Sequence, residues 1–273
     1  MTANVRFTVR APIAPLHEEP RVSSAQVSQR LAGHEVEVLS RDDDWLRVRG
    51  DDGYEGWLHR GYLAAATVAS EVPPRERLRT SLGCTVRRAE SGDRASMPLG
   101  AYLAEDDVIE SGEALGPALL RRVFPLDAGT VASTALERFE GTPYQWGGIT
   151  PWGADCSGFV QSVLVLHGMP MARDAWQQAE RGEPVQGELA ALRPADLLFF
   201  SDREDRRITH VGMAVGPMRM VHVALGRGGY AVEQLDDADD GYVRALRDRF
   251  LFARRLPELH ESAKHANLVL HRA

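Results

Sequence analysis

The stretch Ala154-Asp155-Cys156-Ser157-Gly158-Phe159-Val160-Gln161 decides how the second half of the chain folds. Apolar residues continue from it with helical spacing as far as Leu166, which predicts a helix with one buried face. Gly168 and Pro170 end this pattern. The glycine-rich residues Gly147–Gly153 before it cannot form regular structure. The sequence therefore predicts a loop followed by a buried helix whose first turn carries a cysteine.

Cys156 lies where a catalytic thiol is expected. Unpaired N–H groups in the first turn of a helix carry partial positive charge and stabilise a thiolate, so we expect a lowered pKa and a nucleophile. A lone cysteine is more often a small buried apolar side chain. The other residues of the C-terminal half favour the nucleophile.

Composition excludes several classes of protein. The chain has 273 residues and a formal net charge of −7, so it has no basic footprint for nucleic acid. It contains no apolar run long enough to span a membrane. The N-terminus lacks the apolar core of a secretory signal, which predicts a cytoplasmic protein. Its two cysteines, Cys84 and Cys156, predict a reducing compartment rather than a disulfide framework.

Residues 1–66 are predicted to be a small all-β domain. Short alternating segments are separated by turn residues such as Asp51-Asp52-Gly53, a pattern typical of a small barrel. The predicted strands are Val5–Val9, Glu35–Leu39, Trp45–Arg49 and Tyr54–Leu58.

Residues 67–80, with paired prolines and charges, are predicted to be a linker. Residues 81–127 return to short β-like segments, the best being Gly83–Arg88 and Val108–Gly112, and are predicted to form a second, diverged barrel. Cys84 falls in a predicted strand, where a packed core cysteine is expected.

Residues 128–257 mix helix and strand, and residues 258–273 form a polar tail without an assigned role. Helices are predicted over Thr130–Glu140 and Ala175–Arg181. Tyr242–Arg255 is expected to add a late strand or a short helix. The predicted strands are Asp196–Phe200, His210–Val215 and Met220–Ala224.

A thiolate nucleophile needs a base that takes its proton and later protonates the leaving amine. His210 opens an apolar strand after a charged loop, and His222 lies on the next strand of a predicted hairpin. One histidine can then orient the other. A metal site made of Cys156, His210 and His222 is the alternative, but no ligand spacing supports it. The remaining histidines are predicted to be surface residues: His17, His34, His59, His167, His260, His265 and His271.

Together these segments resemble the NlpC/P60 family of cysteine peptidases. Ala14–Leu63 resembles a bacterial SH3 domain through Glu19-Pro20, the Trp45-x-x-Val48 strand and the Gly53-Tyr54-x-Gly56-Trp57 hairpin. The resemblance implies two SH3-like barrels followed by an α+β, papain-like domain. The matching catalytic-domain segments are Pro143–Gly148, Asp155–Val160, Leu192–Phe200, Thr209–Met213 and Val221–Ala224.

The resemblance also implies roles for individual residues. Cys156 is the implied nucleophile, His210 the base and His222 the orienting residue. Ala175 stands where the family usually has serine, which leaves the substrate's third residue open. For Trp146, packing of a loop aromatic on the core is an equal alternative to pocket lining. The implied substrate-binding residues are Tyr144, Trp146, Asp155, Ser157 and Asp174.

The two-barrel arrangement is similar to cytoplasmic γ-D-glutamyl-L-diamino acid endopeptidases (dipeptidyl-peptidase VI type), which recycle cell-wall peptides. In those enzymes a Glu and a Tyr of the first barrel hold the substrate's free amine, and Glu19 and Tyr54 match them here. The alternatives are an exposed loop charge for Glu19 and barrel packing for Tyr54.

The predicted function is hydrolysis of the γ-D-glutamyl–diamino acid bond in free peptidoglycan stem peptides with an unblocked N-terminal L-Ala. No cofactor or metal is implied, and neither nucleic acid nor a membrane is an expected partner. One alternative is a catalytically silent protein that binds cell-wall peptides. Another is a related cysteine amidase or acyltransferase, because the catalytic set determines the chemistry and the pocket determines the substrate.

Overall fold

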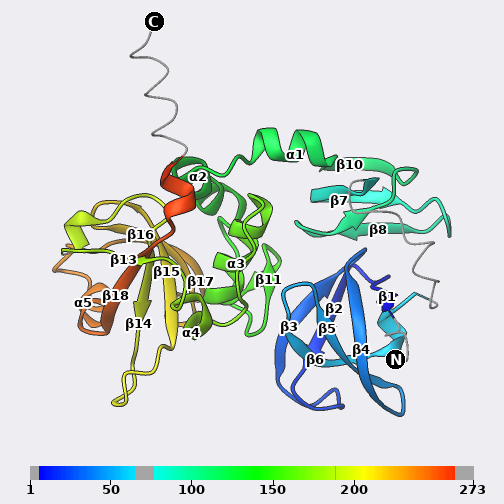
Figure 1. Cartoon of the computed structure of the whole chain (residues 1–273), viewed down its shortest axis with the longest axis horizontal. Coiled ribbons are helices and arrows are strands. Elements are labelled where there is room, and N and C mark those ends of the chain that lie inside the picture. The colour runs from blue at the N-terminus through cyan, green and yellow to red at the C-terminus, as the bar shows by residue number, and fades with distance from the viewer. Residues whose placement is uncertain (1–5, 65–76, 188, 262–273) are drawn as a thin grey trace, which may run out of the picture. The chain divides into compact units, whose positions relative to one another are not determined.

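The computed structural model describes residues 6–64, 77–187 and 189–261. The chain forms two compact units (Figure 1). The first comprises the residues up to Val123 together with Trp146–Trp152, and the second comprises Phe124–Gln145 and the residues from Gly153 onward. The predicted linker at 67–80 and tail at 258–273 lie largely outside the described residues.

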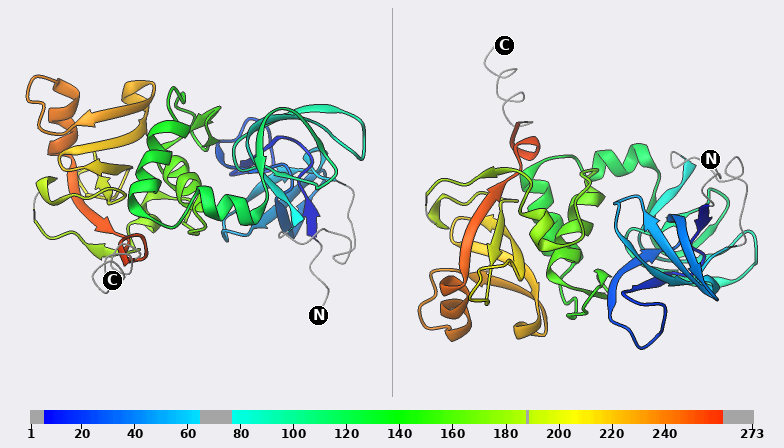
Figure 2. Two further views of the ribbon diagram at one scale, coloured as in Figure 1. Left: turned by 90° about the horizontal axis from the view of Figure 1, so that it is seen from above. Right: turned by 60° about the horizontal axis from the view of Figure 1, so that its bottom comes forward.

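The first unit begins with a six-stranded antiparallel sheet of order β1-β4-β5-β6-β2-β3 (Figures 1 and 2). Two strands, β2 and β3, were not predicted, because Pro15 interrupts the first and polar residues dominate the second. The elements are β1 (Arg6–Thr8), β2 (Ile13–His17), β3 (Gln26–Leu31), β4 (Glu35–Asp42), β5 (Trp45–Gly50), β6 (Glu55–His59) and the 3₁₀ turn η1 (Arg60–Tyr62).

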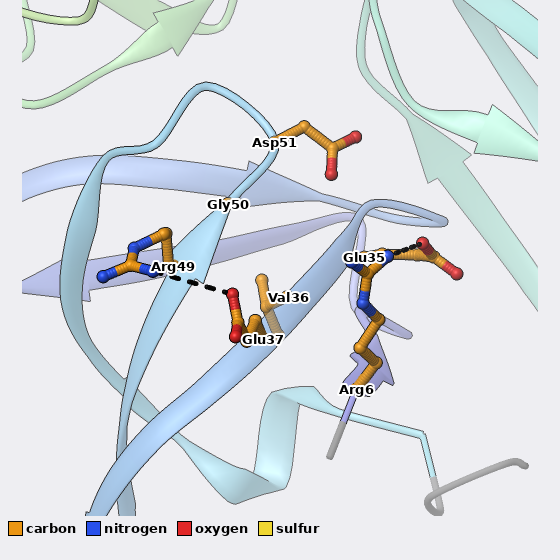
Figure 3. Close-up of a pocket in the computed structure, with 7 residues that line it drawn as sticks. All are labelled: Arg6, Glu35, Val36, Glu37, Arg49, Gly50 and Asp51. Carbon is orange, nitrogen blue, oxygen red and sulfur yellow. Dashed lines mark hydrogen bonds and ion pairs between the residues drawn. The ribbon is translucent and has the colours of Figure 1, made fainter. Parts of the chain in front are cut away.

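A pocket of about 350 Å³ opens on this sheet (Figure 3). Its charges pair with one another: Arg6 lies 3.4 Å from Glu35, and Arg49 lies 3.8 Å from Glu37. None of the predicted site residues lines it. The pocket is therefore a patch of surface ion pairs and not the candidate site.

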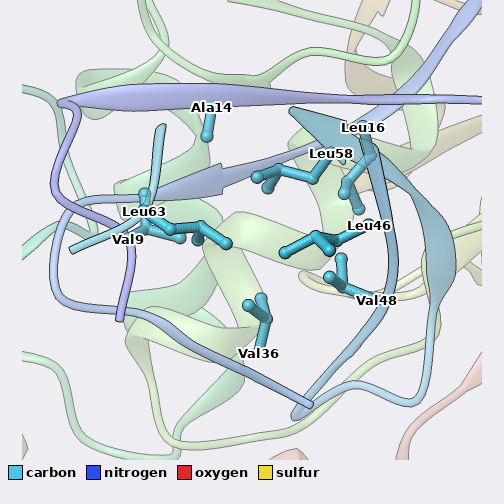
Figure 4. Close-up of a cluster of buried hydrophobic side chains, with 8 residues drawn as sticks. All are labelled: Val9, Ala14, Leu16, Val36, Leu46, Val48, Leu58 and Leu63. Carbon is cyan, nitrogen blue, oxygen red and sulfur yellow. The ribbon is translucent and has the colours of Figure 1, made fainter. Parts of the chain in front are cut away.

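Alternating apolar residues of these strands form one buried cluster (Figure 4). In β5, for example, Leu46 and Val48 are buried while Arg47 and Arg49 are exposed. The cluster consists of Val9, Ala14, Leu16, Val36, Leu46, Val48, Leu58 and Leu63.

A second sheet completes the first unit, with strand order β10-β7-β8 and β9 paired to β7. Cys84 lies buried in β7, as predicted, 3.3 Å from the Ser81 hydroxyl. A helix follows where only β structure was expected, and it starts at Pro117, a favoured first helical residue. The elements are β7 (Arg79–Arg87), β8 (Arg94–Met97), β9 (Tyr102–Leu103), β10 (Val108–Leu115), α1 (Pro117–Val123) and the short β11 (Ile149–Thr150).

The second unit is α+β, with a six-stranded sheet of order β13-β18-β14-β15-β16-β17. Its helices are α2 (Ala128–Arg138), α3 (Cys156–Leu166), α4 (Ala175–Gln178) and α5 (Gly241–Asp248), with 3₁₀ turns η3 (Leu189–Ala191) and η4 (Leu225–Arg227). Its strands are β12 (Gly153–Ala154), β13 (Glu183–Pro184), β14 (Leu197–Phe200), β15 (His210–Gly216), β16 (Arg219–Ala224), β17 (Gly229–Gln234) and β18 (Phe250–Arg255).

Helices α2 and α3 pack together beside this sheet, and α3 contacts β15 and β16 (Figures 1 and 2). The rings of Phe139 and Phe159 are T-shaped to each other at a centroid distance of 5.1 Å, and both are fully buried. Of the described helices, none is both long and apolar enough to cross a membrane.

The predicted strands of the second unit are confirmed by β14, β15 and β16. The segment from Tyr242 to Arg255, expected as strand or helix, contains both α5 and β18. Strand β17 was not predicted, because Gly228 precedes it, Gly229 begins it and its residues are only partly apolar.

Two histidines that were predicted to be exposed are buried. His17 packs edge-on against Trp45, and its Nδ1 lies 3.1 Å from the Ser24 carbonyl oxygen. His167 ends α3, with Nδ1 2.6 Å from the Pro125 carbonyl oxygen and Nε2 2.9 Å from the Thr134 hydroxyl. The prediction was wrong because it weighed only local sequence, whereas both rings meet residues of other segments. His265 and His271 lie outside the described residues.

Candidate active site

Cys156 is the first residue of α3, as predicted. Asp155 caps the helix: its Oδ1 accepts a hydrogen bond of 2.7 Å from the backbone N–H of Gly158. Cys156 therefore lies in the first turn of the helix, where backbone N–H groups have no partner within the helix.

The prediction of a lowered thiol pKa was wrong. The pKa of Cys156 is raised to about 12, chiefly by burial and next by the negative charge of Asp155. Backbone hydrogen bonds from Val211 and Ser157 and the charge of Arg173 oppose this change, but they are smaller effects. Only 8% of Cys156 is exposed, so desolvation of the thiolate outweighs the helix terminus. The resting side chain is a neutral thiol, and its deprotonation requires a base.

The two predicted histidines lie together. The Nε2 atom of His210, at the start of β15, is 2.8 Å from the Nδ1 atom of His222 on β16. Burial holds the pKa of His210 well below its usual value, and His222 lowers it further. His210 is therefore a neutral imidazole at pH 7, the protonation state that a general base needs.

The Cys156 thiol lies next to the end of the sheet where His210 begins β15. The backbone N–H of Val211, the residue after His210, donates a hydrogen bond toward the sulfur of Cys156. Helix α3 also packs on β15 and β16. The structure thus brings the thiol to the strand end that carries His210.

Sequence reasoning missed a carboxylate behind the histidines. The Nε2 atom of His222 lies 3.3 Å from Oε1 of Glu233, which is 4% exposed on β17. Arg227 holds both carboxylate oxygens, through Nε at 2.8 Å and Nη2 at 2.9 Å. The sequence signal that could have revealed Glu233 was a single acidic residue within the partly apolar segment of β17, but β17 itself was not predicted.

Two tyrosines lie near the thiol, one predicted and one missed. Burial raises the pKa of Tyr144, and the charges of Cys156 and Asp155 act on it as well. Tyr242, on α5, was not singled out from the sequence. Burial raises its pKa too, with smaller effects from Glu233 and Cys156. Its ring stands edge-on to His222 at 6.1 Å between centroids.

The predicted substrate-binding residues Asp155 and Ser157 are both buried and both bound to one arginine. Arg173 reaches Asp155 at 3.0 and 2.6 Å and donates to the Ser157 hydroxyl at 2.9 Å. Arg173 is 2% exposed and was not assigned a role from the sequence. It neutralises the carboxylate that lies beside the thiol.

Asp174 and Ala175 mark the start of α4. Asp174 is half-buried as its N-cap, and the backbone N–H of Asp174 lies 3.4 Å from the side-chain oxygen of Gln177. Ala175 is the first helical residue. Asp174, which is predicted to help hold the diamino acid, directly follows Arg173 of the buried ion pair.

Trp146 belongs to the loop that groups with the first unit. Its side chain is 65% exposed, which excludes core packing, and its carbonyl oxygen accepts a 3.0 Å hydrogen bond from Gln26. The Ile149 N–H donates to Gln29 at 3.2 Å. The loop before β12 is therefore anchored to β3 by two glutamines.

The predicted amine-binding residues lie at two turns of the first sheet. Glu19 lies in the turn after β2, is exposed, and forms a 2.6 Å ion pair with Arg21. Tyr54 precedes β6 and packs, half-buried, against the apolar cluster of that sheet. Their predicted role stays a prediction.

Within the described ranges no group of three or more His, Cys, Asp and Glu side chains has an arrangement that could hold a metal ion. The chemistry that the arrangement supports is that of a buried thiol, a neutral imidazole base and a second, carboxylate-linked imidazole. Such a set can form and hydrolyse a thioester.

The sequence matches known families in the same two regions. Residues 141–244 match the NlpC/P60 family and residues 14–64 match the bacterial SH3 domain. The chain is 45% identical over 241 residues to a gamma-D-glutamyl-L-lysine dipeptidyl-peptidase of Bacillus subtilis (strain 168), covering 80% of this chain and 78% of that protein. It is 26% identical over 266 residues to dipeptidyl-peptidase 6 of Lysinibacillus sphaericus, with 87% and 94% covered.

A solved structure shares the fold. The crystal structure of an NlpC/P60 family protein from Bacillus cereus ATCC 10987 superposes with a TM-score of 0.74 at 20% identity, covering 92% of this chain and 99% of that one. The family match and the relatives define a cysteine peptidase. More specifically, the chain belongs to the NlpC/P60 family and carries an N-terminal bacterial SH3 domain, which confirms the predicted resemblance.

Proposed function

We propose that this protein hydrolyses the bond between γ-D-glutamate and a diamino acid in free peptidoglycan stem peptides whose N-terminal L-Ala is unblocked. The observation that carries the proposal is the Cys156 thiol at the start of α3 beside the His210–His222 pair. The name of the B. subtilis relative, which specifies a γ-D-glutamyl-L-lysine bond, supports the choice of substrate. Cell-wall recycling in the cytoplasm is part of this proposal.

In the proposed reaction, His210 removes the proton of the Cys156 thiol as the sulfur attacks the γ-carbonyl carbon of D-glutamate. The backbone N–H of Cys156, at the helix N-terminus, is the proposed donor to the oxyanion. His210 then gives the proton to the leaving amine, and the diamino acid departs. Water, activated by His210, hydrolyses the thioester and regenerates the thiol.

Substrate binding is proposed for five further residues. Tyr144 and Trp146 line the pocket, Asp155 and Ser157 contact the substrate, and Asp174 helps to hold the diamino acid. The contacts of Arg173 support the proposed roles of Asp155 and Ser157, because they hold these two side chains in fixed positions next to the thiol.

The first unit has a proposed role in selection. We infer that Glu19 and Tyr54 bind the free amine of L-Ala, so that intact wall, whose stem is amidated, is rejected. We also infer that the second sheet, β7 to β10, is a diverged SH3-like barrel. The order β10-β7-β8 with β9 on β7 supports a small antiparallel unit of this kind.

Mass spectrometry of the products from L-Ala-γ-D-Glu-diamino-acid peptides tests the function. The expected products are L-Ala-D-Glu and the free diamino acid or its C-terminal peptide, with no products from Cys156→Ser. Binding without cleavage identifies a silent peptide-binding protein. Cleavage of a different amide, or transfer of the acyl group to an added amine, identifies an amidase or an acyltransferase.

A further inference from the structure

Three neighbouring strands place one polar side chain each in a continuous line. His222 on β16 is opposite Ala231 on β17, so Glu233, two residues further along, projects from the same face and reaches it diagonally. On the other side of β16, a Cβ added to Gly212 would come within 3.5 Å of His222 Cβ. Gly212 is therefore the β15 neighbour of His222, and His210 lies two residues earlier on the same strand.

The hydrogen-bonding capacity of the three groups fixes where the protons lie. An ionised carboxylate can only accept, so His222 must carry a proton on Nε2 to donate to Glu233. Neutral His222 then has a bare Nδ1, which can only accept. His210 must therefore be protonated on Nε2 to donate across the 2.8 Å contact, and its Nδ1 is left unprotonated.

Glu233 is held in the ionised form. Burial raises the pKa of Glu233. Together, the hydrogen bonds and charges of His222 and Arg227 lower it by more, so the net pKa lies below the usual value. Arg227 is itself fixed: its guanidinium lies 4.3 Å above the ring of Tyr242 and forms an ion pair with Asp240. The acceptor that faces His222 therefore has both a fixed charge and a fixed position.

We infer that Glu233 is a positioning residue that sets the tautomer of His222 and, through it, leaves Nδ1 of His210 free to accept the thiol proton. Arg227 is the clamp that keeps the carboxylate in place. The inference rests on the proposed function for its catalytic consequence, but the tautomers themselves are a property of the folded protein. No contact between Glu233 and substrate is involved.

The test is ¹⁵N NMR of histidine-labelled protein near pH 7.5, in a Cys156→Ala background that cannot turn over. We expect Nε2–H tautomers for both His210 and His222. Glu233→Leu removes the acceptor and should mix or reverse the tautomer of His222. Glu233→Gln should retain it, because an amide oxygen at the Oε1 position can still accept from His222 and from Arg227 Nε.

Asp196→Asn is the matched control. Asp196 is another buried carboxylate, directly before β14, and Arg255 binds it at 2.8 and 2.6 Å. Among the described residues, its side-chain partners do not include His210 or His222. Its variant should leave the His222 signals unchanged. A His222 protonated on Nδ1 in the parent protein, or an unchanged tautomer in Glu233→Leu, would overturn the inference. If Glu233→Leu does not fold, the tautomer of His222 in the parent protein alone decides whether the inference holds.

Kinetics with Cys156 intact give the second readout. A positioned acid–base group contributes about 10²–10⁴-fold, so loss of its orientation in Glu233→Leu should lower kcat by about 10- to 100-fold with KM nearly unchanged. Glu233→Gln should recover most of this loss. If the stem peptides are not substrates, the NMR result still stands, so failure of the proposed function and failure of this inference are separable. A kcat in Glu233→Leu equal to that of the parent enzyme would contradict the inference.

Discussion

Arg173 and Asp155 form a buried ion pair directly beside the thiol, with nitrogen–oxygen distances of 3.0 and 2.6 Å. Asp155 also caps α3, so one carboxylate starts the helix, binds the arginine and raises the pKa of Cys156. The pair links the segment before α4 to the first turn of α3. Its removal should therefore be felt in stability as well as in activity.

Arg173→Ala should lower the free energy of unfolding by about 3–5 kcal/mol, because it leaves the Asp155 carboxylate buried without a partner. Urea denaturation at pH 7 measures this. Arg203→Ala, which removes an exposed ion pair with Asp205, is the control and should leave the unfolding midpoint unchanged. Equal midpoints for the two variants would show that the buried pair contributes nothing.

The alkylation rate of Cys156 should rise about tenfold per pH unit between pH 7 and 9.5, because its thiol pKa is raised to about 12 and only the thiolate reacts. Iodoacetamide labelling of Cys84→Ser, which keeps a single thiol, measures this rate. Cys156→Ser reports the background from Cys84. A rate that is constant from pH 6 upward would instead indicate a stable thiolate–imidazolium pair.

The acidic limb of kcat/KM should lie below pH 6.5. His210 must be neutral to act as a base, and its pKa is held well below the usual value, so activity is lost only when the pH falls through that lowered pKa. Burial is the main cause of the lowered pKa, so in His222→Asn the limb should stay below pH 6.5 while kcat falls. A limb above pH 6.5 in the unmodified enzyme would contradict this protonation scheme.

Glu19→Gln should lower kcat/KM on free-amine peptides by about 10- to 100-fold, the usual contribution of a hydrogen bond to a charged group. The parent enzyme and Glu19→Gln should both cleave N-acetylated peptides poorly. The ratio of kcat/KM for free-amine over acetylated peptides should therefore be smaller in the variant. Glu18→Gln, one residue away, is the matched control and should behave as the parent enzyme. If the parent enzyme cleaves acetylated and free peptides equally well, Glu19 does not select the amine.

The local sequence alone determined several features of this protein. The helix that begins at Cys156 follows from apolar spacing and from the glycines on either side, both of which act within a few residues. The strands of His210 and His222 follow from short apolar runs. Family resemblance added the two domain types, which the relatives confirm.

Only the tertiary structure decided the rest of the site. Glu233, Tyr242 and Arg173 reach it through strand register, helix packing and a long-range ion pair, and none of these leaves a local signal. The protonation of Cys156 was predicted wrongly for the same reason. A helix terminus is visible in sequence, but the pKa of a thiol depends on how much water the whole fold removes from it, and here desolvation is the larger effect.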